Sequence, residues 1–290
     1  MSAVLKNEFL EARISSLGAE LRNLRRLDSG REYMWSGDPA QWNRVAPLLF
    51  PIVGRLRDDS YTWQGRRYGL PQHGFARDLE FDLVHEDGES ASFLLGSAGP
   101  FLDRYPQQFQ LAVSFTLEGA ALTVRHDVFN PSGSDDLLFS LGAHPAFRWP
   151  LDESDAPDSH ALRFERTETA DRLEVGTDGL LTGRKVPFFR DVDQIKLRPD
   201  LFRAGAVVLE GLKSDEVTFA SESGRGVRLR APGARWWGFW TRPGAPFLCL
   251  EPWHGVADTA QADWDLRGKP GIVALAPGDS WSWTLRIEPF

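Results

Sequence analysis

The sequence predicts an all-β protein made of antiparallel strands and folded as a single domain over residues 1–290. Apolar and polar residues alternate from one end of the chain to the other, which is the period of a half-buried strand. Glycine- and proline-containing turns separate the short apolar runs, and no long stripe of apolar residues has helical spacing. Many short strands between such turns are typical of a large antiparallel sandwich or barrel.

The clearest strand pair lies in the middle of the chain. Residues 111–117 and 122–128 both alternate, and Glu118-Gly119 stands between them where a hairpin turn is expected. Residues 281–287 predict a closing strand, which follows the turn residues Pro277-Gly278-Asp279.

Two segments depart from this strand pattern. Asp38-Pro39 has the signature of a helix start, a capping residue followed by proline, and predicts one short helix toward Trp42. The acidic stretch at residues 152–158 predicts a surface loop, because it is too short for a convincing linker between domains.

The charge and cysteine content limit the partners. The formal net charge is −8 and no lysine- and arginine-rich run forms a basic stripe, so we expect no nucleic-acid partner and no anionic membrane partner. No apolar stretch is long enough to span a bilayer, and the first eight residues lack the pattern of a signal peptide. The single Cys249 excludes an intramolecular disulfide, and the sequence shows no cluster of metal ligands. We therefore expect a cytoplasmic protein, a monomer or homodimer, without a metal.

The tryptophan content is high, at 11 of 290 residues. Aromatic side chains suit the half-buried surface of a pleated sheet, so most of them are expected to serve packing. The alternative is that some tryptophan rings stack on the flat apolar faces of a sugar.

Three polar segments interrupt the strands where strands do not require polar residues. His73 lies between a proline-containing turn and a glycine, and His144 follows Gly142-Ala143 at the end of an apolar run. Loops and strand ends are where scaffolds place functional groups. Glu251 follows four apolar residues and is expected at the end of a buried strand, where an unpaired carboxylate is costly. The structural alternatives are a hydrogen-bonded histidine in the first two cases and an ion pair with an arginine for Glu251.

Two arginines are further candidates. Arg55 follows an apolar run as Glu251 does, and its planar guanidinium suits a carboxylate or sugar hydroxyls. Arg77 lies four residues after His73 and is expected closer to the surface. None of these segments is a phosphate loop, a nucleotide fingerprint or a serine nucleophile elbow.

The remaining histidines carry less weight. His126 shares the phase of an apolar strand face and is expected in the core, whereas His85 and His160 lie among polar residues and are expected in solvent. His254 is a minor candidate because it lies close to Glu251 in the sequence.

At these segments the sequence resembles the aldose 1-epimerase (galactose mutarotase-like) superfamily, and within it the compact bacterial LacX-like branch. The resemblance covers nearly the whole chain. The motifs that carry it are, in order, Leu17-Gly18-Ala19-Glu20-Leu21, Pro47-Leu48-Leu49-Phe50-Pro51-Ile52-Val53-Gly54-Arg55, Gln72-His73-Gly74-Phe75-Ala76-Arg77, Gly142-Ala143-His144-Pro145-Ala146-Phe147, Leu250-Glu251-Pro252-Trp253 and Pro277-Gly278. The resemblance implies a supersandwich of antiparallel β-sheets with a sugar site in an open cleft, and a chemistry that needs no metal and no cofactor.

The same resemblance assigns roles to the candidates. Glu251 is implied to take the proton of the anomeric hydroxyl, and His144 to protonate the ring oxygen. The ring then opens to the aldehyde, rotates about the first carbon–carbon bond and closes as the other anomer. His73 and Arg55 are implied to hold hydroxyls and the developing charge, and Arg77 is a further candidate for substrate binding.

One position departs from the family pattern. Relatives often carry an Asp that contacts the substrate just before the strand that begins here at Ala206, and this chain has Arg203-Ala204-Gly205 instead. Either another residue makes that contact or the preferred sugar differs.

The resemblance leaves the substrate and the role open at a finer level. Residues 72–77 are also similar to the hexose-6-phosphate epimerase branch, in which arginines near the cleft meet the phosphate, and Arg77 is the candidate for that role. Residues 51–55 fit the free-sugar branch better. The predicted function is therefore anomer interconversion of a free hexose, with a hexose-6-phosphate 1-epimerase or a non-catalytic sugar-binding protein as alternatives. A glycoside hydrolase would need a second carboxylate opposite Glu251, and no motif selects one.

Overall fold

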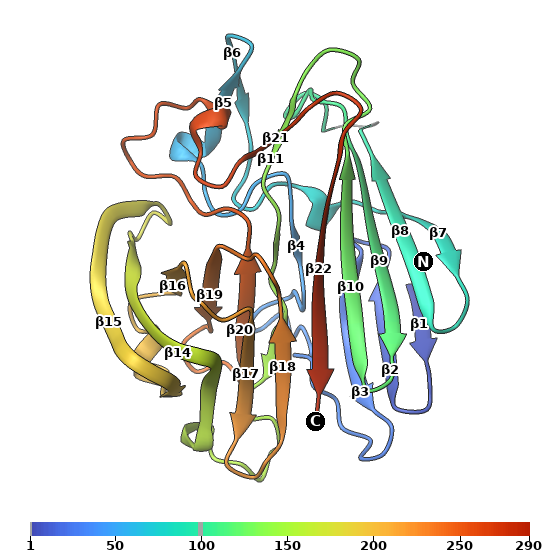
Figure 1. Cartoon of the computed structure of the whole chain (residues 1–290), viewed down its shortest axis with the longest axis vertical. Coiled ribbons are helices and arrows are strands. Elements are labelled where there is room, and N and C mark those ends of the chain that lie inside the picture. Colours follow the sequence, from blue (N-terminus) through green and yellow to red (C-terminus); the bar gives the residue numbers. More distant parts are fainter. Residues whose placement is uncertain (1, 98–100) are drawn as a thin grey trace.

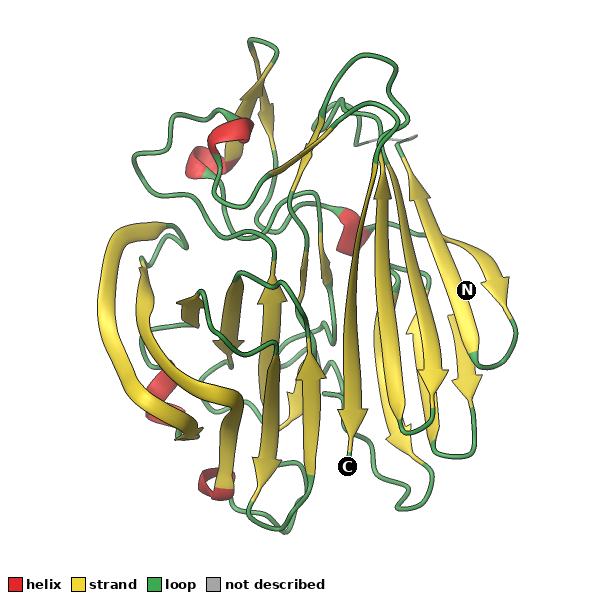
Figure 2. Cartoon of the chain, in the orientation of Figure 1, coloured by secondary structure: helices red, strands yellow, loops and turns green. Residues whose placement is uncertain are grey.

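The computed structural model describes residues 2–97 and 101–290, which form β-strands joined by turns and a few single-turn helices (Figure 1, Figure 2). Every pairing between named strands in these ranges is antiparallel. The predicted all-β, antiparallel fold class is confirmed.

Most of the strands belong to one large curved sheet, which contains 15 strands in the described part of the chain. In spatial order its main path is β4 (Leu48–Leu49), β12 (Gly142–Ala143), β20 (Phe247–Trp253), β19 (Trp236–Trp240), β16 (Val207–Glu210), β14 (His160–Val175), β17 (Glu216–Ser221), β18 (Gly226–Arg230), β22 (Ser280–Pro289), β10 (Ala121–Phe129), β9 (Gln110–Glu118), β8 (Ser90–Gly96) and β7 (Asp82–Glu86). Off this path, β13 (Ala146–Arg148) pairs with β20, and β15 (Leu181–Lys196) pairs with β14.

The smaller elements complete the fold. A three-stranded sheet consists of β1 (Ser2–Lys6), β2 (Leu10–Ser15) and β3 (Glu20–Arg26). Two two-stranded sheets are the hairpin of β5 (Ser60–Trp63) with β6 (Arg66–Gly69), and the pair of β11 (Leu137–Phe139) with β21 (Val273–Leu275), which are far apart in the sequence. The helices in the described ranges are 3₁₀ turns at Arg57–Asp59, Ala76–Asp78, Pro157–Ser159, Pro199–Phe202 and Leu266–Gly268. None of the helices described is long and apolar enough to cross a membrane.

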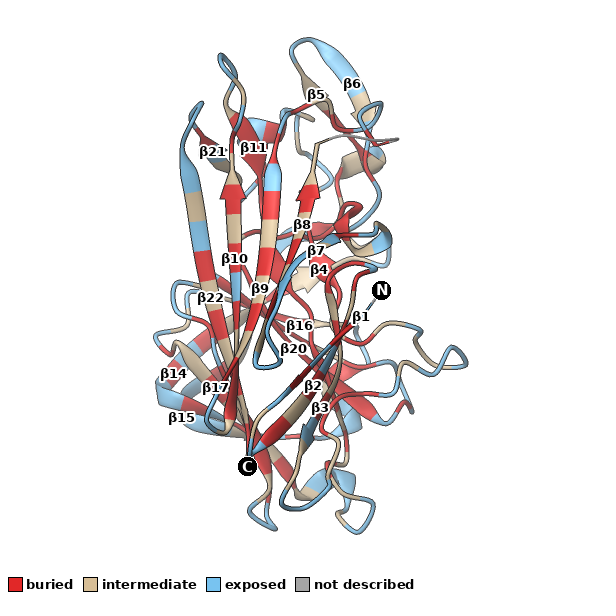
Figure 3. Cartoon of the chain, turned by 90° about the vertical axis from the view of Figure 1, so that its right-hand side faces the viewer, coloured by how far each residue is buried: buried red, intermediate tan, exposed pale blue. Residues whose placement is uncertain are grey.

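The hairpin predicted in the middle of the chain is confirmed. β9 pairs with β10 through Ala121 opposite Glu118, and β22, the predicted closing strand, pairs with the other edge of β10. Buried and partly exposed residues alternate along these strands, as Figure 3 shows by its colours. One hydrophobic cluster contains residues from Ala3 in β1 to Ile287 in β22, so the first and last strands share a core.

The position of β20 inside the large sheet explains why its side chains are buried. β20 lies between β12 and β13 on one side and β19 on the other, and all seven of its residues are buried. Its neighbour β19 is rich in aromatic residues, and the Trp237 side chain there is fully buried. Full burial of a large apolar side chain stabilises a fold by about 1.5–3 kcal/mol.

The helix predicted from Asp38-Pro39 toward Trp42 is wrong. The segment forms a turn in which the Asp38 side chain accepts a hydrogen bond from the amide of Ala40 (2.9 Å), as a cap would, but no helix follows. The Trp42 ring stacks on Phe247 with ring centroids 5.4 Å apart, and its carbonyl accepts a hydrogen bond from the indole of Trp35 (3.0 Å). These tertiary contacts stabilise a non-helical backbone conformation in this segment.

The solvent exposure predicted for His160 is also wrong, whereas His85 is exposed as expected. His160 is fully buried, and its Nε2 accepts a hydrogen bond from the amide of Leu151 (3.2 Å). The acidic segment before it, residues 152–158, forms the predicted loop of turns but folds back over the histidine.

His126 lies in β10 and faces the core, as the sequence predicts, with its ring stacked on Trp283 at 5.5 Å. Burial lowers the pKa of His126 from its ordinary value of 6.5 to about 4. The unfolded chain therefore binds a proton at this residue near pH 6.5, which the folded chain does not bind until about pH 4. The free energy of unfolding must fall as the pH drops through this window, by up to about 3 kcal/mol from His126 alone.

We expect His126→Phe to lose this part of the acid sensitivity, measured as the urea midpoint between pH 7 and pH 4. His85→Gln, a change at an exposed histidine, should keep the pH dependence of the wild type. A His126→Phe protein with unchanged pH dependence would contradict the assignment.

Candidate active site

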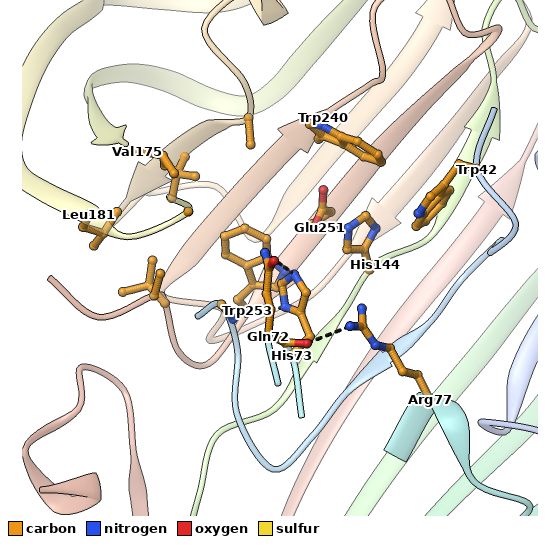
Figure 4. A pocket seen from close by; sticks show the side chains of 16 residues that line it. Trp42, Gln72, His73, Arg77, His144, Val175, Leu181, Trp240, Glu251 and Trp253 are labelled. Atoms are coloured by element: carbon orange, nitrogen blue, oxygen red, sulfur yellow. Dashed lines mark hydrogen bonds and ion pairs between the residues drawn. The ribbon is translucent and has the colours of Figure 1, made fainter. Parts of the chain in front are cut away.

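A cavity of about 360 Å³ opens beside β20 (Figure 4). Segments that are far apart in the sequence meet here, and four of the five sequence-predicted site residues, Glu251, His144, His73 and Arg77, line it. The complete lining is Trp42, Gly54, Gln72, His73, Arg77, His144, Val175, Gly179, Leu181, Ala206, Val208, Trp240, Glu251, Trp253, Val256 and Ala257. A volume in this range is usual for a small-molecule site.

His144 and Glu251 are in direct polar contact inside the cavity. Nε2 of His144 lies 3.0 Å from Oε2 of Glu251, and the side chains are 9% and 2% exposed. A carboxylate this deeply buried needs a partner, and the partner is the histidine rather than the arginine that the structural alternative required. Nδ1 of His144 is buried and has no hydrogen-bond partner among the described residues.

Neighbouring strands position this pair. Glu251 and Trp253 lie in β20, and His144 follows directly after β12, which pairs with β20 through Gly142 opposite Trp253. A side chain at Gly142 or at Gly238, in β19, would come within 2.6 Å of the Trp253 ring. Two glycines on opposite sides of β20 therefore leave the room in which the indole lies against the cavity.

The loop that carries His73 is fixed to the segment before β5 by backbone hydrogen bonds. The amide of His73 donates to the carbonyl of Gly54 (2.9 Å), and the amides of Phe75 and Ala76 donate to the carbonyl of Phe50 (3.0 and 3.2 Å). His73 itself has a φ of +67°, which is unusual for a residue with a side chain and is typically found at functional sites.

The hydrogen bonds of His73 define where its proton lies. The amide of Gly54 donates to Nδ1 of His73 (3.1 Å), so Nδ1 carries the lone pair and Nε2 carries the hydrogen. Burial, helped by the nearby charge of Arg77, holds the pKa of His73 well below its usual value, so the ring is neutral at neutral pH. His73 therefore offers a ligand one N–H donor. The same Nε2 lies 3.3 Å from the side-chain nitrogen of Gln72, and because both nitrogens carry hydrogen in this tautomer, they do not hydrogen-bond to each other.

Arg77 lies on the same side of the cavity and is more buried than the sequence predicts, with a side chain 17% exposed. One of its terminal nitrogens donates to the carbonyl of Gln72 (2.7 Å), and its Nε is buried without a hydrogen-bond partner among the described residues. Burial and the neighbouring Arg44 lower the pKa of Arg77 to about 10, so it remains charged at neutral pH.

Arg55 is the one predicted site residue that the structure does not bring into the cavity lining. Its guanidinium donates hydrogen bonds to both carboxylate oxygens of Asp59 (2.7 and 2.6 Å) and to the carbonyl of Asp178 (2.9 Å). These contacts tie the segment after β4 to the turn at Gly179, which lines the cavity. A direct contact between Arg55 and a sugar stays a prediction, and the observed contacts favour a role in holding this turn.

Two tryptophans that the sequence did not single out as site residues line the cavity next to His144. Trp42 and Trp240 are both partly buried and lie 5.1 and 5.9 Å from the His144 ring, centroid to centroid. They pack edge to face against each other at 5.4 Å. The high tryptophan count was the only signal that could have found them, and it does not distinguish these two from tryptophans in the core.

Three side chains that could ligate a metal meet at the Glu251 end of the cavity. Ligand atoms of His144, Cys249 and Glu251 lie within 4.8 Å of one another. Burial, together with the charge of Glu251, raises the pKa of the Cys249 thiol well above its usual value, and a thiol is a far poorer ligand than a thiolate. The residues therefore fit a metal poorly, and a metal-free site stays our prediction.

A buried lysine, also missed in the sequence, supports the floor of the cavity. The ammonium of Lys269 donates to the carbonyl of Val256 and lies 3.5 Å from a carboxylate oxygen of Asp258. Val256 and Ala257 line the cavity, and Ala257 is in close contact with Gly54. Burial lowers the pKa of Lys269 to about 8.

Solved structures with the same architecture identify the fold. A galactose mutarotase related enzyme from Lactobacillus acidophilus is 31% identical, with a TM-score of 0.93 over 100% of this chain and 97% of that one. A galactose mutarotase-like protein from Lactobacillus casei is 29% identical, with a TM-score of 0.94 over 100% of both chains. The chain therefore has the galactose mutarotase-like supersandwich fold that the sequence predicts.

The family follows from the sequence comparison. The model of the aldose 1-epimerase family matches residues 1–288, and the chain belongs to this family. It is similar to the chromosomal protein LacX of Lactococcus lactis, with 35% identity over 291 residues that cover 97% of this chain and 96% of that protein. The LacX-like resemblance is confirmed.

The close packing of Gly74, the residue after His73, allows a test of how firmly this loop is held in place. Gly74, with a φ of +69°, packs so closely that a Cβ atom there would lie 2.3 Å from the carbonyl oxygen of Phe50. Gly65 has a similar φ of +74° but open space around it, so an alanine at this position introduces backbone strain without a steric clash. We expect Gly74→Ala to destabilise the protein by about 1–3 kcal/mol more than Gly65→Ala, because overpacking adds to the strain. Chemical denaturation of both variants measures this difference, and equal losses would show that the loop can move away freely.

Proposed function

We propose that the protein is an aldose 1-epimerase that interconverts the α and β anomers of a free aldose, with Glu251 as the base and His144 as the acid. The observation that carries this proposal is the 3.0 Å contact between the two side chains inside a sugar-sized cavity. The anomeric hydroxyl and the ring oxygen are bonded to the same carbon. A base for one and an acid for the other must therefore lie side by side.

The proposed reaction needs one proton transfer at each group. A carboxylate oxygen of Glu251 removes the proton of the anomeric hydroxyl while the His144 ring, protonated on both nitrogens, gives its Nε2 hydrogen to the ring oxygen and becomes neutral. The bond between C1 and the ring oxygen breaks. The open aldehyde rotates about its C1–C2 bond. In the return step, His144 takes the proton back from the attacking hydroxyl and Glu251 protonates the new anomeric oxygen.

The surrounding residues fit supporting roles in this proposal. The neutral His73 can donate its Nε2 hydrogen to a sugar hydroxyl, and Arg77 can donate to another while stabilising negative charge. Trp42 and Trp240 enclose the acid and exclude water from it. We further propose a cytoplasmic location and a monomer or homodimer, in line with the single buried cysteine.

The test is the rate of anomer equilibration above the buffer rate, followed by polarimetry on fresh α-glucose and α-galactose. We expect Glu251→Gln and His144→Gln each to lose about 10²- to 10⁴-fold in kcat, because a positioned acid or base contributes this much. Glu210→Gln in β16 and His85→Gln, both outside the cavity, should keep the wild-type rate. If the wild type is no faster than Glu251→Gln on every sugar, the enzymatic proposal fails. Tight sugar binding in that case would favour the non-catalytic sugar-binding alternative.

A second candidate, a hexose-6-phosphate 1-epimerase, is favoured by one observation. The buried and charged Arg77 has an Nε with no hydrogen-bond partner among the described residues, and its nearest carboxylate oxygen, on Asp78, lies 3.8 Å away. An arginine fork binds phosphate well. Under this alternative, Arg77→Gln would raise KM for glucose 6-phosphate at least tenfold more than KM for glucose. Under the proposed free-sugar function, the variant would weaken both sugars to a similar extent, and the wild type would prefer the sugar without phosphate.

A further inference from the structure

The lining of the cavity has two chemically different ends (Figure 4). Polar side chains from residues 72–77, from His144 and from Glu251 form the polar end. The aliphatic end is a wall without hydrogen-bonding side chains, and its members are Val175, Leu181, Ala206, Val208, Val256 and Ala257. Of these, Val256 and Ala257 lie in an irregular segment after β20, outside the named strands. This part of the wall therefore needs a support other than strand pairing.

A buried ion pair supports this segment. The side chains of Lys269 and Asp258 are 1% and 4% exposed, and Nζ of Lys269 lies 3.5 Å from Oδ1 of Asp258. The ammonium also donates to the carbonyl of Val256. Taking two charges out of water costs free energy that their attraction does not always return, and apolar residues of similar volume often replace such a pair without loss of stability. Stability alone is therefore a weak reason for this pair.

Asp258 joins three pieces of chain around the cavity. Its second carboxylate oxygen accepts a hydrogen bond from the amide of Arg57 (3.1 Å), and its own amide donates to the carbonyl of Arg55 (2.9 Å). Its carbonyl accepts from the amide of Leu181 (2.7 Å), the first residue of β15. The segment before β5, the start of β15 and the segment after β20 therefore meet at this one residue.

The same junction reaches the polar end through Gly54. A Cβ atom on Gly54 would lie 2.4 Å from the amide nitrogen of Ala257, so the two backbones are in close contact. Gly54 in turn forms two hydrogen bonds with His73. Burial is the main cause of the low pKa of His73, and the charge of Lys269 is among those that add to it. The ion pair is therefore connected to both ends of the cavity.

We propose that Lys269 and Asp258 are positioning residues of the sugar site, which set how tightly a sugar is bound without taking part in the proton transfers. This inference rests on the proposed function and adds residues that act on substrate binding. Without the ammonium, the carbonyl of Val256 loses its donor and the wall is free to shift. His144 and Glu251 keep their places, because β12 and β20 hold them. The ion pair therefore acts on KM rather than on kcat.

The first variant is Lys269→Met, which removes the charge and both contacts of Nζ. We expect KM for glucose or galactose to rise at least about tenfold while kcat stays within about threefold of the wild type, measured by anomer exchange. Lys185→Met is the matched control, because it breaks an exposed ion pair with Glu210 (3.0 Å), and it should leave both constants unchanged. An unchanged KM in folded Lys269→Met, or a loss that lies wholly in kcat, overturns the inference.

A double variant separates positioning from stability. Lys269→Met alone leaves Asp258 buried without its countercharge, which is destabilising. Adding Asp258→Asn removes the second charge, and the new side-chain oxygen can still accept from the amide of Arg57. We expect the double variant to regain most of the lost urea midpoint and to keep the raised KM, because the carbonyl of Val256 still lacks its donor. If KM recovers together with the midpoint, the pair serves only the stability of the fold and the inference is wrong. Should the single variant not fold, KM and kcat of the double variant decide alone.

Calorimetric binding of the same sugars separates this inference from the proposed function. If the wild type binds a sugar without accelerating its anomer exchange, the epimerase function fails. A Kd raised at least about tenfold by the substitution at Lys269 would then still support the positioning role, and an unchanged Kd would contradict it. A wild type that neither binds these sugars nor accelerates their exchange overturns both.

Discussion

The contact between His144 and Glu251 constrains the rest of this molecule. The carboxylate is 2% exposed, and burying it without a partner would cost more free energy than a typical protein has to spare. The partner comes from a separate part of the chain, at the end of β12, so the pair exists only if β12 and β20 are correctly registered. Their pairing through Gly142 and Trp253 supplies that register, and the missing side chain at Gly142 leaves room for the indole. Folding and site assembly are thus one event at this point of the sheet.

A second constraint comes from the way the His73 loop is attached. Its backbone groups bond to Phe50 and Gly54, and these bonds also settle the hydrogen on the His73 ring, because the Gly54 amide occupies Nδ1. The same backbone segment continues to Arg55. The hydrogen bonds of Arg55 to Asp59 and to the carbonyl of Asp178 hold the turn before β15, which lines the opposite side of the cavity through Gly179. One short stretch of chain therefore connects the polar end of the site to the aliphatic end.

The sequence was sufficient to predict the strand pattern and four of the side chains that line the cavity, those of Glu251, His144, His73 and Arg77. Alternation and turn residues define β9, β10 and β22, and the apolar run before Glu251 predicts its burial, since these are local properties of the chain. The wall of the cavity could not be predicted, because Val175, Leu181 and Val208 look like ordinary strand residues and only the pairing of β14 with β15 and β16 brings them together. The environments of Arg55 and His160 likewise depend on distant segments, which is why an arginine expected in the site lies beside it and a histidine expected in solvent is buried.

The location of Glu251 in an interior strand bears on how fast the site can rearrange. Amide groups in a strand that is paired on both sides become accessible to solvent only when a large part of the sheet opens, so their hydrogen exchange approaches the limit set by global unfolding. β20 is paired on both sides, and its side chains are buried throughout. The carboxylate that we propose as the base therefore lies on a rigid element, and the parts of the site that can rearrange more easily are the loops around it. Under the proposed function, any conformational step of the reaction would then belong to those loops rather than to an opening of the strand that carries the carboxylate.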